Sequence, residues 1–246
     1  MRAVYGYYES SEAERRKHDT SRPGVGLNAR ARWEVLRRAL TACDLPAGAC
    51  VLDVGCGAGH DLLWIADLLA PLGPRLHGVD LLTDRVERAR RRVPVATFHA
   101  CGAEQLPYEN GEFDVVIVST VFSSILDDRS AQAVAREITR VLACRGVILC
   151  YDMRYPNPRN PHTRAIGLRK LRWLFPGAEL SAVPVTLLPP LARGLGALAR
   201  PAHRALYAIP MLRSHYLTEI RPGRLVASPE RGSGIHEKSR SRRNSR

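Results

Sequence analysis

A short apolar run followed by three alternating glycines constrains the fold of this chain more than any other feature. Residues 51–54 read Val-Leu-Asp-Val, and Gly55, Gly57 and Gly59 follow at every second position. The apolar run predicts a buried strand, and the glycines allow a tight turn that a ligand can approach closely. A helix beginning after Gly59 would direct its free N–H groups and positive dipole end at that ligand. The segment therefore predicts a cradle for a nucleotide-type cofactor.

Strand-like and helix-like segments alternate on both sides of this loop. Strands are predicted at 50–54, 76–79, 95–99, 113–118 and 146–151, and helices at 29–42, 60–69, 83–92 and 130–142. The strand at 113–118 is a continuous Val/Ile-rich run, as expected for a parallel strand covered on both faces. Such alternation predicts an α/β fold with a doubly wound, mostly parallel, seven-stranded Rossmann-like sheet.

The rest of the chain is predicted to extend this core within a single domain, residues 1–221. Residues 1–45 form an N-terminal helical cap, in which Asn28 caps the helix at 29–42, and Ser130 caps the helix at 130–142. A helix at 163–175 and strands at 180–187 and 214–220 follow. Prolines divide residues 188–213 into short helices. This insertion is expected near the carboxyl edge of the sheet as a lid on the substrate site, with contact to a membrane surface as the alternative.

The charge and the cysteine content limit the possible binding partners and the cellular compartment of the protein. The net charge is +13, and residues 222–246 hold seven basic and two acidic residues with few large apolar ones, which predicts a disordered basic tail. Such a tail could add affinity for RNA or anionic membranes, or have no role. No apolar leader follows Met1 and no apolar run is long enough to span a membrane. The six cysteines show no C-x-x-C or zinc spacing, so we expect a cytoplasmic protein without a metal site.

The glycine loop and the segments after it resemble the class I S-adenosylmethionine-dependent methyltransferases. The register G-x-G-x-G differs from the dinucleotide fingerprint G-x-G-x-x-G, and no phosphate-loop motif occurs. The resemblance covers roughly residues 48–152, the expected cofactor-binding core. It is carried by the run 53–59, by Asp80 at the end of the second strand, by Ala103-Glu104-Gln105-Leu106-Pro107, and by the turn at 140–149.

The resemblance implies S-adenosylmethionine as cofactor, with S-adenosylhomocysteine as product. Asp80 is expected to accept hydrogen bonds from both ribose hydroxyls. Gly102 stands where many relatives carry an Asp that bonds the adenine amine, so that contact is not expected here. The implied cofactor-binding residues are Asp53, Gly55, Cys56, Gly57, Gly59, Asp80, Leu81, Ala103, Glu104 and Ser119.

The sequence constrains the methyl acceptor less than it constrains the cofactor. The segments 120–127, 151–161, 188–193 and 215–217 resemble a type 11-like bacterial subgroup linked to natural-product and glycan gene clusters, which implies a small-molecule or sugar acceptor. We expect the methyl group to be transferred to an oxygen of that acceptor. Candidate general bases are His162, Asp152 and His215, each of which could instead have only a structural role. Tyr7, Tyr8 and Arg159 are the candidate substrate-binding residues, although the tyrosines could simply pack on the sheet.

Two other functions compete with this interpretation. An RNA methyltransferase would suit the basic tail, but the chain lacks an N-P-P-[YF]-type motif and a recognisable RNA-binding module, so nucleic acid is not the expected partner. A non-catalytic binding protein with the same fold would have no need for Asp53 and Asp80. Both a monomer and a homodimer fit the sequence.

Overall fold

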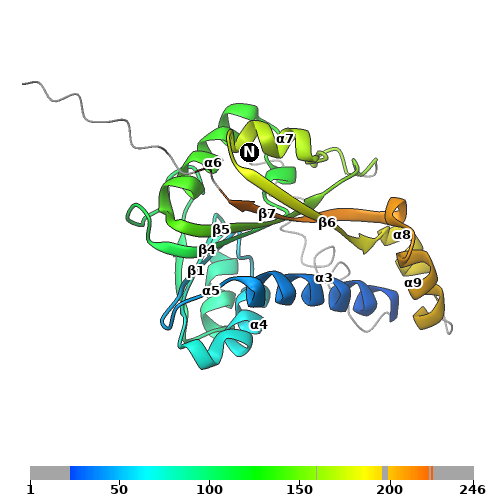
Figure 1. The fold of residues 1–246 in the computed structure, drawn as a ribbon, viewed down its shortest axis with the longest axis horizontal. Helices are drawn as coiled ribbons and strands as arrows, with labels where there is room; N and C mark the ends of the chain where they lie inside the picture. The colour runs from blue at the N-terminus through cyan, green and yellow to red at the C-terminus, as the bar shows by residue number, and fades with distance from the viewer. Residues whose placement is uncertain (1–22, 159, 196–198, 222, 224–246) are drawn as a thin grey trace, which may run out of the picture.

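The computed structural model describes residues 23–158, 160–195, 199–221 and 223, and they form a seven-stranded sheet (Figure 1). The strands are β1 (Cys50–Val54), β2 (Arg75–Asp80), β3 (Thr97–Ala100), β4 (Phe113–Ser119), β5 (Leu142–Met153), β6 (Glu179–Leu187) and β7 (Arg213–Arg221). Their order is β3-β2-β1-β4-β5-β7-β6. The first five strands pair in parallel, and β7 runs antiparallel to both β5 and β6. The predicted mostly parallel α/β fold is confirmed.

Helices cover both faces of the sheet (Figure 1). One face carries α3 (Pro23–Ala42), α4 (His60–Leu69) and α5 (Thr83–Arg92), and the other carries α6 (Asp128–Val141) and α7 (Leu168–Leu174). Because side chains alternate along a strand, β1 and β4 supply a core to each face. Val51 and Val115 pack with the first group of helices, whereas Leu52 and Val116 pack with the second. All five β1 residues are buried, as a strand covered on both faces requires.

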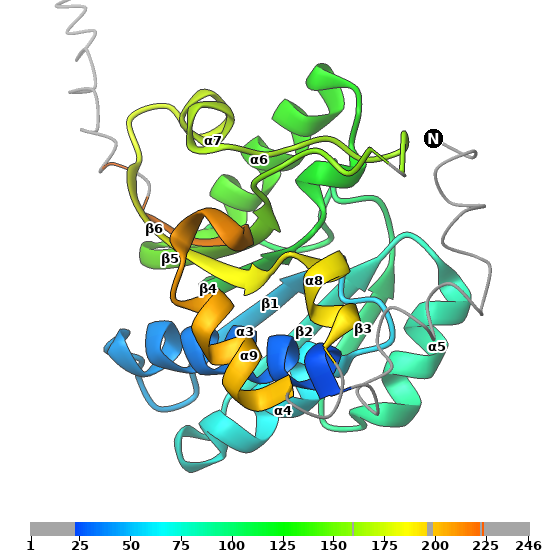
Figure 2. The same cartoon turned by 90° about the vertical axis from the view of Figure 1, so that its right-hand side faces the viewer.

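The carboxyl ends of the parallel strands meet at one edge of the sheet. The glycine loop after β1, Asp80 at the end of β2 and Ser119 at the end of β4 all lie there. The insertion between β6 and β7 also leaves from this edge, because β6 has the same direction as β5. It contains α8 (Pro189–Gly194), α9 (Ala199–Tyr207) and the 3₁₀ helix η3 (Pro210–Leu212), and it lies beside α3 (Figure 2).

The N-terminal helix begins earlier than its sequence predicts. It starts at Pro23, so Asn28 lies inside α3 and not at its N-cap. The Asn28 amide instead forms two hydrogen bonds with Leu187 at the end of β6: its Nδ2 donates to the carbonyl (2.9 Å) and its Oδ1 accepts from the backbone N–H (3.0 Å). A side-chain amide has the same donor and acceptor as a peptide group, so it can extend the pairing of a strand end.

The starts of two other helices differ from their predicted positions because of local hydrogen bonds. The helix α6 starts at Asp128 with Asp127 as its cap, whose carboxylate accepts a hydrogen bond from the Ser130 N–H (2.7 Å), so Ser130 is not the cap. The predicted helix at 163–175 shortens to α7, because Arg164 and Ile166 donate their N–H groups to the carbonyls of Ser123 (2.9 Å) and Met153 (2.7 Å). Among the described residues, no helix is both long and apolar enough to cross a bilayer.

Candidate cofactor and acceptor site

The glycine loop after β1 has the backbone that its sequence predicts. Gly55, Gly57 and Gly59 have φ angles of 74°, 53° and 77°, in the left-handed region that favours glycine. A Cβ at Gly55 would lie 2.5 Å from the Val121 side chain, whereas a Cβ at Gly57 would meet nothing within 4 Å. Packing therefore requires the first glycine, and the second faces open space where a ligand can approach the backbone.

Asp80 is held directly against this loop. It is 8% exposed, and its Oδ2 and Oδ1 accept hydrogen bonds from the N–H groups of Gly57 (2.9 Å) and Leu82 (3.0 Å). An ionised carboxylate has about four lone-pair sites, so each oxygen can still accept a second hydrogen bond. The geometry fits a ligand with two adjacent hydroxyl groups.

Asp53, at the end of the apolar run, has a buried carboxylate oxygen that no described residue satisfies. The side chain is 1% exposed, and within the described part of the chain its Oδ1 receives no hydrogen bond. Burial, reinforced by the charges of Asp61 and Asp80, holds the pKa of Asp53 well above its usual range. An unsatisfied buried oxygen is costly, so this position fits a ligand group that donates a hydrogen bond.

The loop after β3 provides a second wall beside Asp80. The Cys101 N–H donates to the Asp80 carbonyl (3.1 Å), which ties this loop to the end of β2. A Cβ at Gly102 would lie 2.8 Å from a Glu104 carboxylate oxygen and 3.9 Å from a Leu81 methyl, so the predicted residues Leu81 and Glu104 do come together. Leu81 is 43% exposed, and an apolar side chain open beside the loop fits a flat ring. Ala103 lies between Gly102 and Glu104 and is partly buried.

Cys56 occupies a different position from the one its sequence context suggests. Its side chain is 7% exposed, and its sulfur lies 3.0 Å from the site of a Cβ at Gly78 in β2. Burial raises the pKa of the thiol. The side chain therefore packs against β2, and the backbone N–H of Cys56 donates to the Val79 carbonyl (2.9 Å).

Arg32 of α3 joins the site through contacts that the sequence analysis missed. Its guanidinium forms an ion pair with Asp61 in the first turn of α4 and donates to Ser119 Oγ (2.9 Å). Ser119 Oγ in turn donates to Asp61 (3.1 Å). Burial disfavours the guanidinium cation, but Asp61 outweighs this effect and the pKa of Arg32 is raised. A permanent positive charge therefore lies at the carboxyl edge, next to Asp53.

Tyr151 of β5 forms an aromatic wall beside Arg32. The guanidinium carbon lies 4.7 Å from the Tyr151 ring centroid, and His215 of β7 stacks on the same ring at 4.8 Å with an interplanar angle of 2°. The Tyr151 hydroxyl lies 2.6 Å from Thr186 Oγ1, and burial raises the pKa of Tyr151 to about 12. The phenol is therefore neutral at ordinary pH. Of the three candidate bases, His215 is the one placed against this wall.

The other two candidate bases lie in or beside the loops at the same edge. Asp152 is 2% exposed and accepts hydrogen bonds from the N–H groups of Ser123 (3.0 Å) and Met153 (2.7 Å), so it holds the loop after β4. His162 lies in the loop after β5, where its N–H donates to the Asn160 side chain (3.1 Å). Their catalytic roles stay predictions. Tyr7, Tyr8 and Arg159 lie outside the described residues, as does the tail apart from Gly223.

Comparison with known proteins gives a consistent result for the core. Residues 51–146 match the family model described as a methyltransferase domain. An uncharacterized methyltransferase of Synechocystis sp., sll0829, is 32% identical over 110 residues, which are 45% of this chain and 50% of that protein. The methyltransferase GfsG of Streptomyces halstedii is 31% identical over 116 residues, 45% of this chain and 40% of that protein. The chain thus spans half or less of the length of these two relatives.

Solved structures share the fold over a longer stretch. Geranyl diphosphate C-methyltransferase from Streptomyces coelicolor A3(2), solved with Mg²⁺, geranyl diphosphate and S-adenosylhomocysteine, has a TM-score of 0.57 at 15% identity and covers 76% of each chain. The [4+2]-cyclase SpnF has a TM-score of 0.55 at 20% identity, covering 76% of this chain and 81% of that one. At these identities the likeness establishes the fold alone.

Proposed function

We propose that this chain, whose residues 51–146 match a methyltransferase domain, is a class I S-adenosylmethionine-dependent methyltransferase that transfers the methyl group of its donor to a small-molecule acceptor. The observation that carries this proposal is the Asp80 carboxylate held against an open glycine backbone, with the unpaired Asp53 beside it. These features together offer the acceptors that a nucleoside with a charged amino-acid end requires.

Each part of the donor has a matching group in the proposed site. Asp80 would accept hydrogen bonds from the ribose hydroxyls, and Leu81 would lie against the adenine. The amino-acid end carries an ammonium and a carboxylate, for which Asp53 offers a hydrogen-bond acceptor and Arg32 a positive charge. When bound, the donor supplies a sulfonium methyl group that is displaced in line by the acceptor.

The acceptor that we favour is a hydroxyl of a natural-product or sugar intermediate. The similarity of the core to a methyltransferase from Streptomyces supports a small-molecule acceptor, and the choice of oxygen rests on the candidate bases at this edge of the sheet. As the oxygen–methyl bond forms and the sulfur–methyl bond breaks, the hydroxyl proton must pass to a base. His215 is the best placed of the candidates, because it stacks on the Tyr151 wall next to Arg32. The insertion at the same edge would limit the entry of water.

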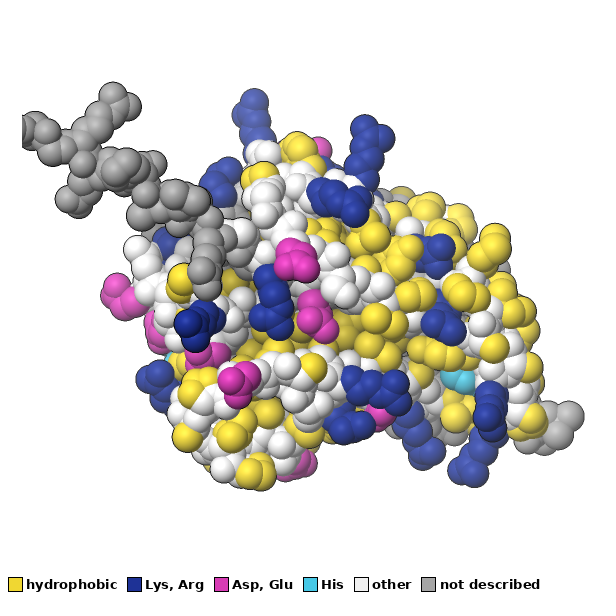
Figure 3. Space-filling view, viewed as in Figure 1, with side chains coloured by type: hydrophobic (Ala, Val, Ile, Leu, Met, Phe, Trp, Pro, Cys, Tyr) yellow, Lys and Arg dark blue, Asp and Glu magenta, His cyan; other side chains and the backbone are white. Residues whose placement is uncertain are grey.

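Other features bear on partners and location. On the face shown in Figure 3, Lys and Arg side chains are scattered and not gathered into a stripe, which supports a small-molecule acceptor over a nucleic acid. All six cysteines are unpaired, and we infer a reducing, cytoplasmic location. The insertion has arginines at positions 193, 200 and 204 and no acidic residue, so a peripheral membrane contact stays compatible with this proposal.

The first test of the proposal is calorimetric binding of S-adenosylmethionine and S-adenosylhomocysteine. We expect the wild type to bind both ligands and Asp80→Ala to lose about 1.5–3 kcal/mol of binding free energy, as for hydrogen bonds to a charged group. Such a loss weakens binding roughly 10- to 150-fold. Asp84→Ala is the matched control, because Asp84 is an exposed acid four residues away that forms an ion pair with Arg88. Absence of binding to the folded wild type would refute the proposal.

A second candidate function is a reaction that uses the bound donor without methyl transfer. The observation that favours it is the similarity of part of this chain to the S-adenosyl-L-methionine-dependent Diels-Alderase iccD of Talaromyces variabilis, 39% identical over 70 residues. Incubation with methyl-labelled donor and a panel of phenols, sugars and isoprenoid alcohols separates the two functions. Release of S-adenosylhomocysteine together with a labelled acceptor supports the transferase, whereas donor binding without release across the panel supports the alternative.

A further inference from the structure

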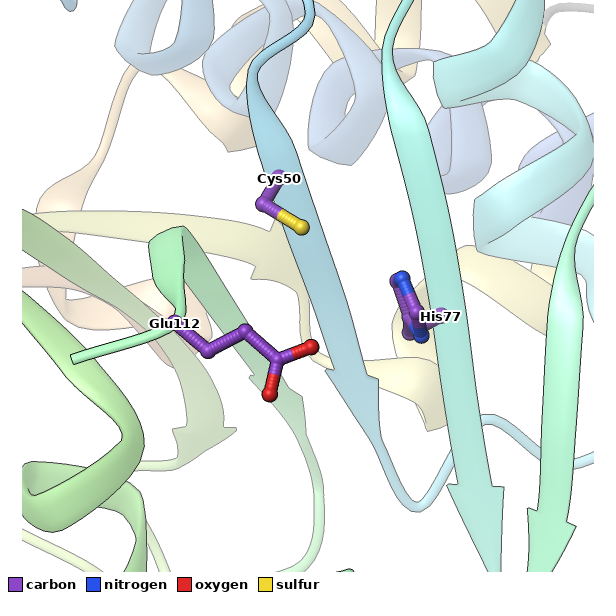
Figure 4. A group of neighbouring side chains, drawn as sticks. All are labelled: Cys50, His77 and Glu112. Atoms are coloured by element: carbon purple, nitrogen blue, oxygen red, sulfur yellow. The ribbon is translucent and has the colours of Figure 1, made fainter. Parts of the chain in front are cut away.

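A group of metal-ligating side chains lies at the end of the sheet opposite the cofactor site. It consists of Cys50 at the start of β1, His77 in β2 and Glu112 just before β4 (Figure 4). One ligand atom from each residue lies within 4.8 Å of the others. Cys50 and Gly55 are separated by the length of β1, roughly 16 Å at strand spacing. This cluster is therefore separate from the glycine loop and the acceptor site.

Packing fixes the positions of the three side chains. The Cys50 N–H donates to a carboxylate oxygen of Asp114 (2.8 Å), which anchors the start of β1. The parallel register pairs Leu52 with His77, so Cys50 and His77 project from the same face of the sheet, as Figure 4 shows. The His77 ring meets Phe113 edge-on at 5.3 Å. The cluster is thus built from three adjacent strands.

The cluster also contains an unused acceptor. The Nδ1 atom of His77 is buried and has no hydrogen-bond partner in the described part of the chain. Glu112 supplies a negative charge, and one of its oxygens also accepts the Glu109 N–H (2.9 Å). Arg75, at the start of β2, is the nearby positive group that a bound cation would have to tolerate.

We propose that Cys50, His77 and Glu112 bind one divalent transition-metal ion, with zinc as the best match. Thiolate sulfur, imidazole nitrogen and carboxylate oxygen are the three ligand types that zinc takes in tetrahedral sites. A water molecule completes the set, and the Cys50 thiol releases its proton to solvent on binding. The ion would join β1, β2 and the start of β4 and stabilise the fold without taking part in methyl transfer.

The site has no sequence signature because its ligands are far apart in the chain. The prediction of no metal site relied on short spacings such as C-x-x-C, which arise when one turn supplies two ligands. Here each ligand comes from a different strand segment, and only the β2-β1-β4 order brings them together.

Cobalt binding to the metal-free full chain tests the proposal. We expect one Co²⁺ per chain, with the visible bands of four-coordinate cobalt and a near-ultraviolet thiolate-to-cobalt charge-transfer band, both removed by added Zn²⁺. The charge-transfer band should vanish in Cys50→Ser and persist in Cys144→Ser, because Cys144 is exposed and outside the cluster. No binding by the wild type, or a band that survives Cys50→Ser, would overturn the site.

Two further measurements guard against a variant that fails to fold. Circular dichroism and S-adenosylhomocysteine binding report folding, and Glu112→Gln changes the cluster at a partly buried position. We expect Glu112→Gln to weaken Co²⁺ binding at least tenfold, and Glu109→Gln, a nearby exposed acid, to leave it unchanged. Equal affinities of Glu112→Gln and the wild type would reject Glu112 as a ligand. Since the readout is the metal spectrum, a failure here is distinguishable from a failure of the methyltransferase proposal.

Discussion

Asp53 is a buried carboxyl group whose protonation makes the stability of the fold depend on pH. Its pKa is well above the usual range because burial penalises the charged form, although Arg32 acts in the opposite direction. A group with a raised pKa in the folded state binds its proton more tightly there than in the unfolded chain. The stability that it contributes is present at low pH and is lost as the pH rises through the folded-state pKa.

Asp53→Asn is therefore expected to change the pH dependence of stability. The ligand-free variant should be more stable than the wild type at neutral and alkaline pH, and this advantage should shrink as the pH falls and Asp53 is protonated. Urea unfolding at several pH values measures the difference, with the exposed acid in Asp84→Asn as control. A difference that does not vary with pH would contradict the expectation.

Single residues of the site differ in how far the sequence reveals them. Asp80 and the glycines are identifiable because their spacing around one strand and the next is itself the motif. Arg32 and Asp61 are not, because an arginine on an amphipathic helix and an acid in a first helical turn are common surface features. Only the packing of α3 against α4 and β4 brings them together.

Among the elements, the helix α3 contacts α8 of the insertion, and this contact could not be predicted from the sequence. Its first turn packs directly on α8 of the insertion, with Gly24 as the point of closest approach. A Cβ at Gly24 would lie 1.8 Å from the Ala192 carbonyl oxygen. The helix itself was predictable from its apolar spacing, but its start was not, because Asn28 is typical of an N-cap and here binds β6.

Gly24→Ala should destabilise the protein, against the usual effect of this change. Replacing a helical glycine by alanine normally gains roughly 0.5–1 kcal/mol. Here α3 and α8 would have to separate, and overpacking of this kind costs about 1–3 kcal/mol. Denaturant unfolding and limited proteolysis of the insertion measure the effect. Gly194→Ala is the matched control because a Cβ there meets nothing within 4 Å, and an equal response of the two variants would refute the expected clash.

At the scale of the whole molecule, two cores share one sheet. Phe113 and Ile148 belong to the core under α6 and α7, whereas Ile117 and Leu149 belong to the core under α3, α4 and α5. Neighbouring residues of the same strands contribute to opposite cores. Loss of one core would therefore disrupt the strands that also supply side chains to the other core. We therefore expect one cooperative unfolding transition.

Tryptophan fluorescence can follow the two faces separately. Trp33 and Trp64 contact each other on the face of α3 and α4, with ring centroids 4.6 Å apart and an interplanar angle of 34°. Trp173 lies on α7, on the other face of the sheet, beneath the Lys170 ammonium. Trp173→Phe reports the first face, and a Trp33→Phe, Trp64→Phe double variant reports the second. Within each variant, urea midpoints from fluorescence and from circular dichroism should coincide. Two separate midpoints would show that the faces unfold independently.

The strands and helices of the parallel core could be predicted from the sequence, whereas the complete order of the strands in the sheet could not. Alternating segments gave the parallel core and its helices, because each periodicity is local. The position of β7 between β5 and β6 was not accessible, since it depends on pairing between strands distant in the chain, such as Ile148 with Ile220. The metal cluster proposed above was missed for the same reason.

The two outermost strands have a consequence for how copies of this chain can meet. An exposed strand edge is a template on which another molecule can add a strand. At one edge β3 has only four residues, and at the other β6 carries Pro184, which has no N–H group to donate. Both features disfavour strand addition at the sheet edges, and with it open-ended, fibre-like association of copies of this chain.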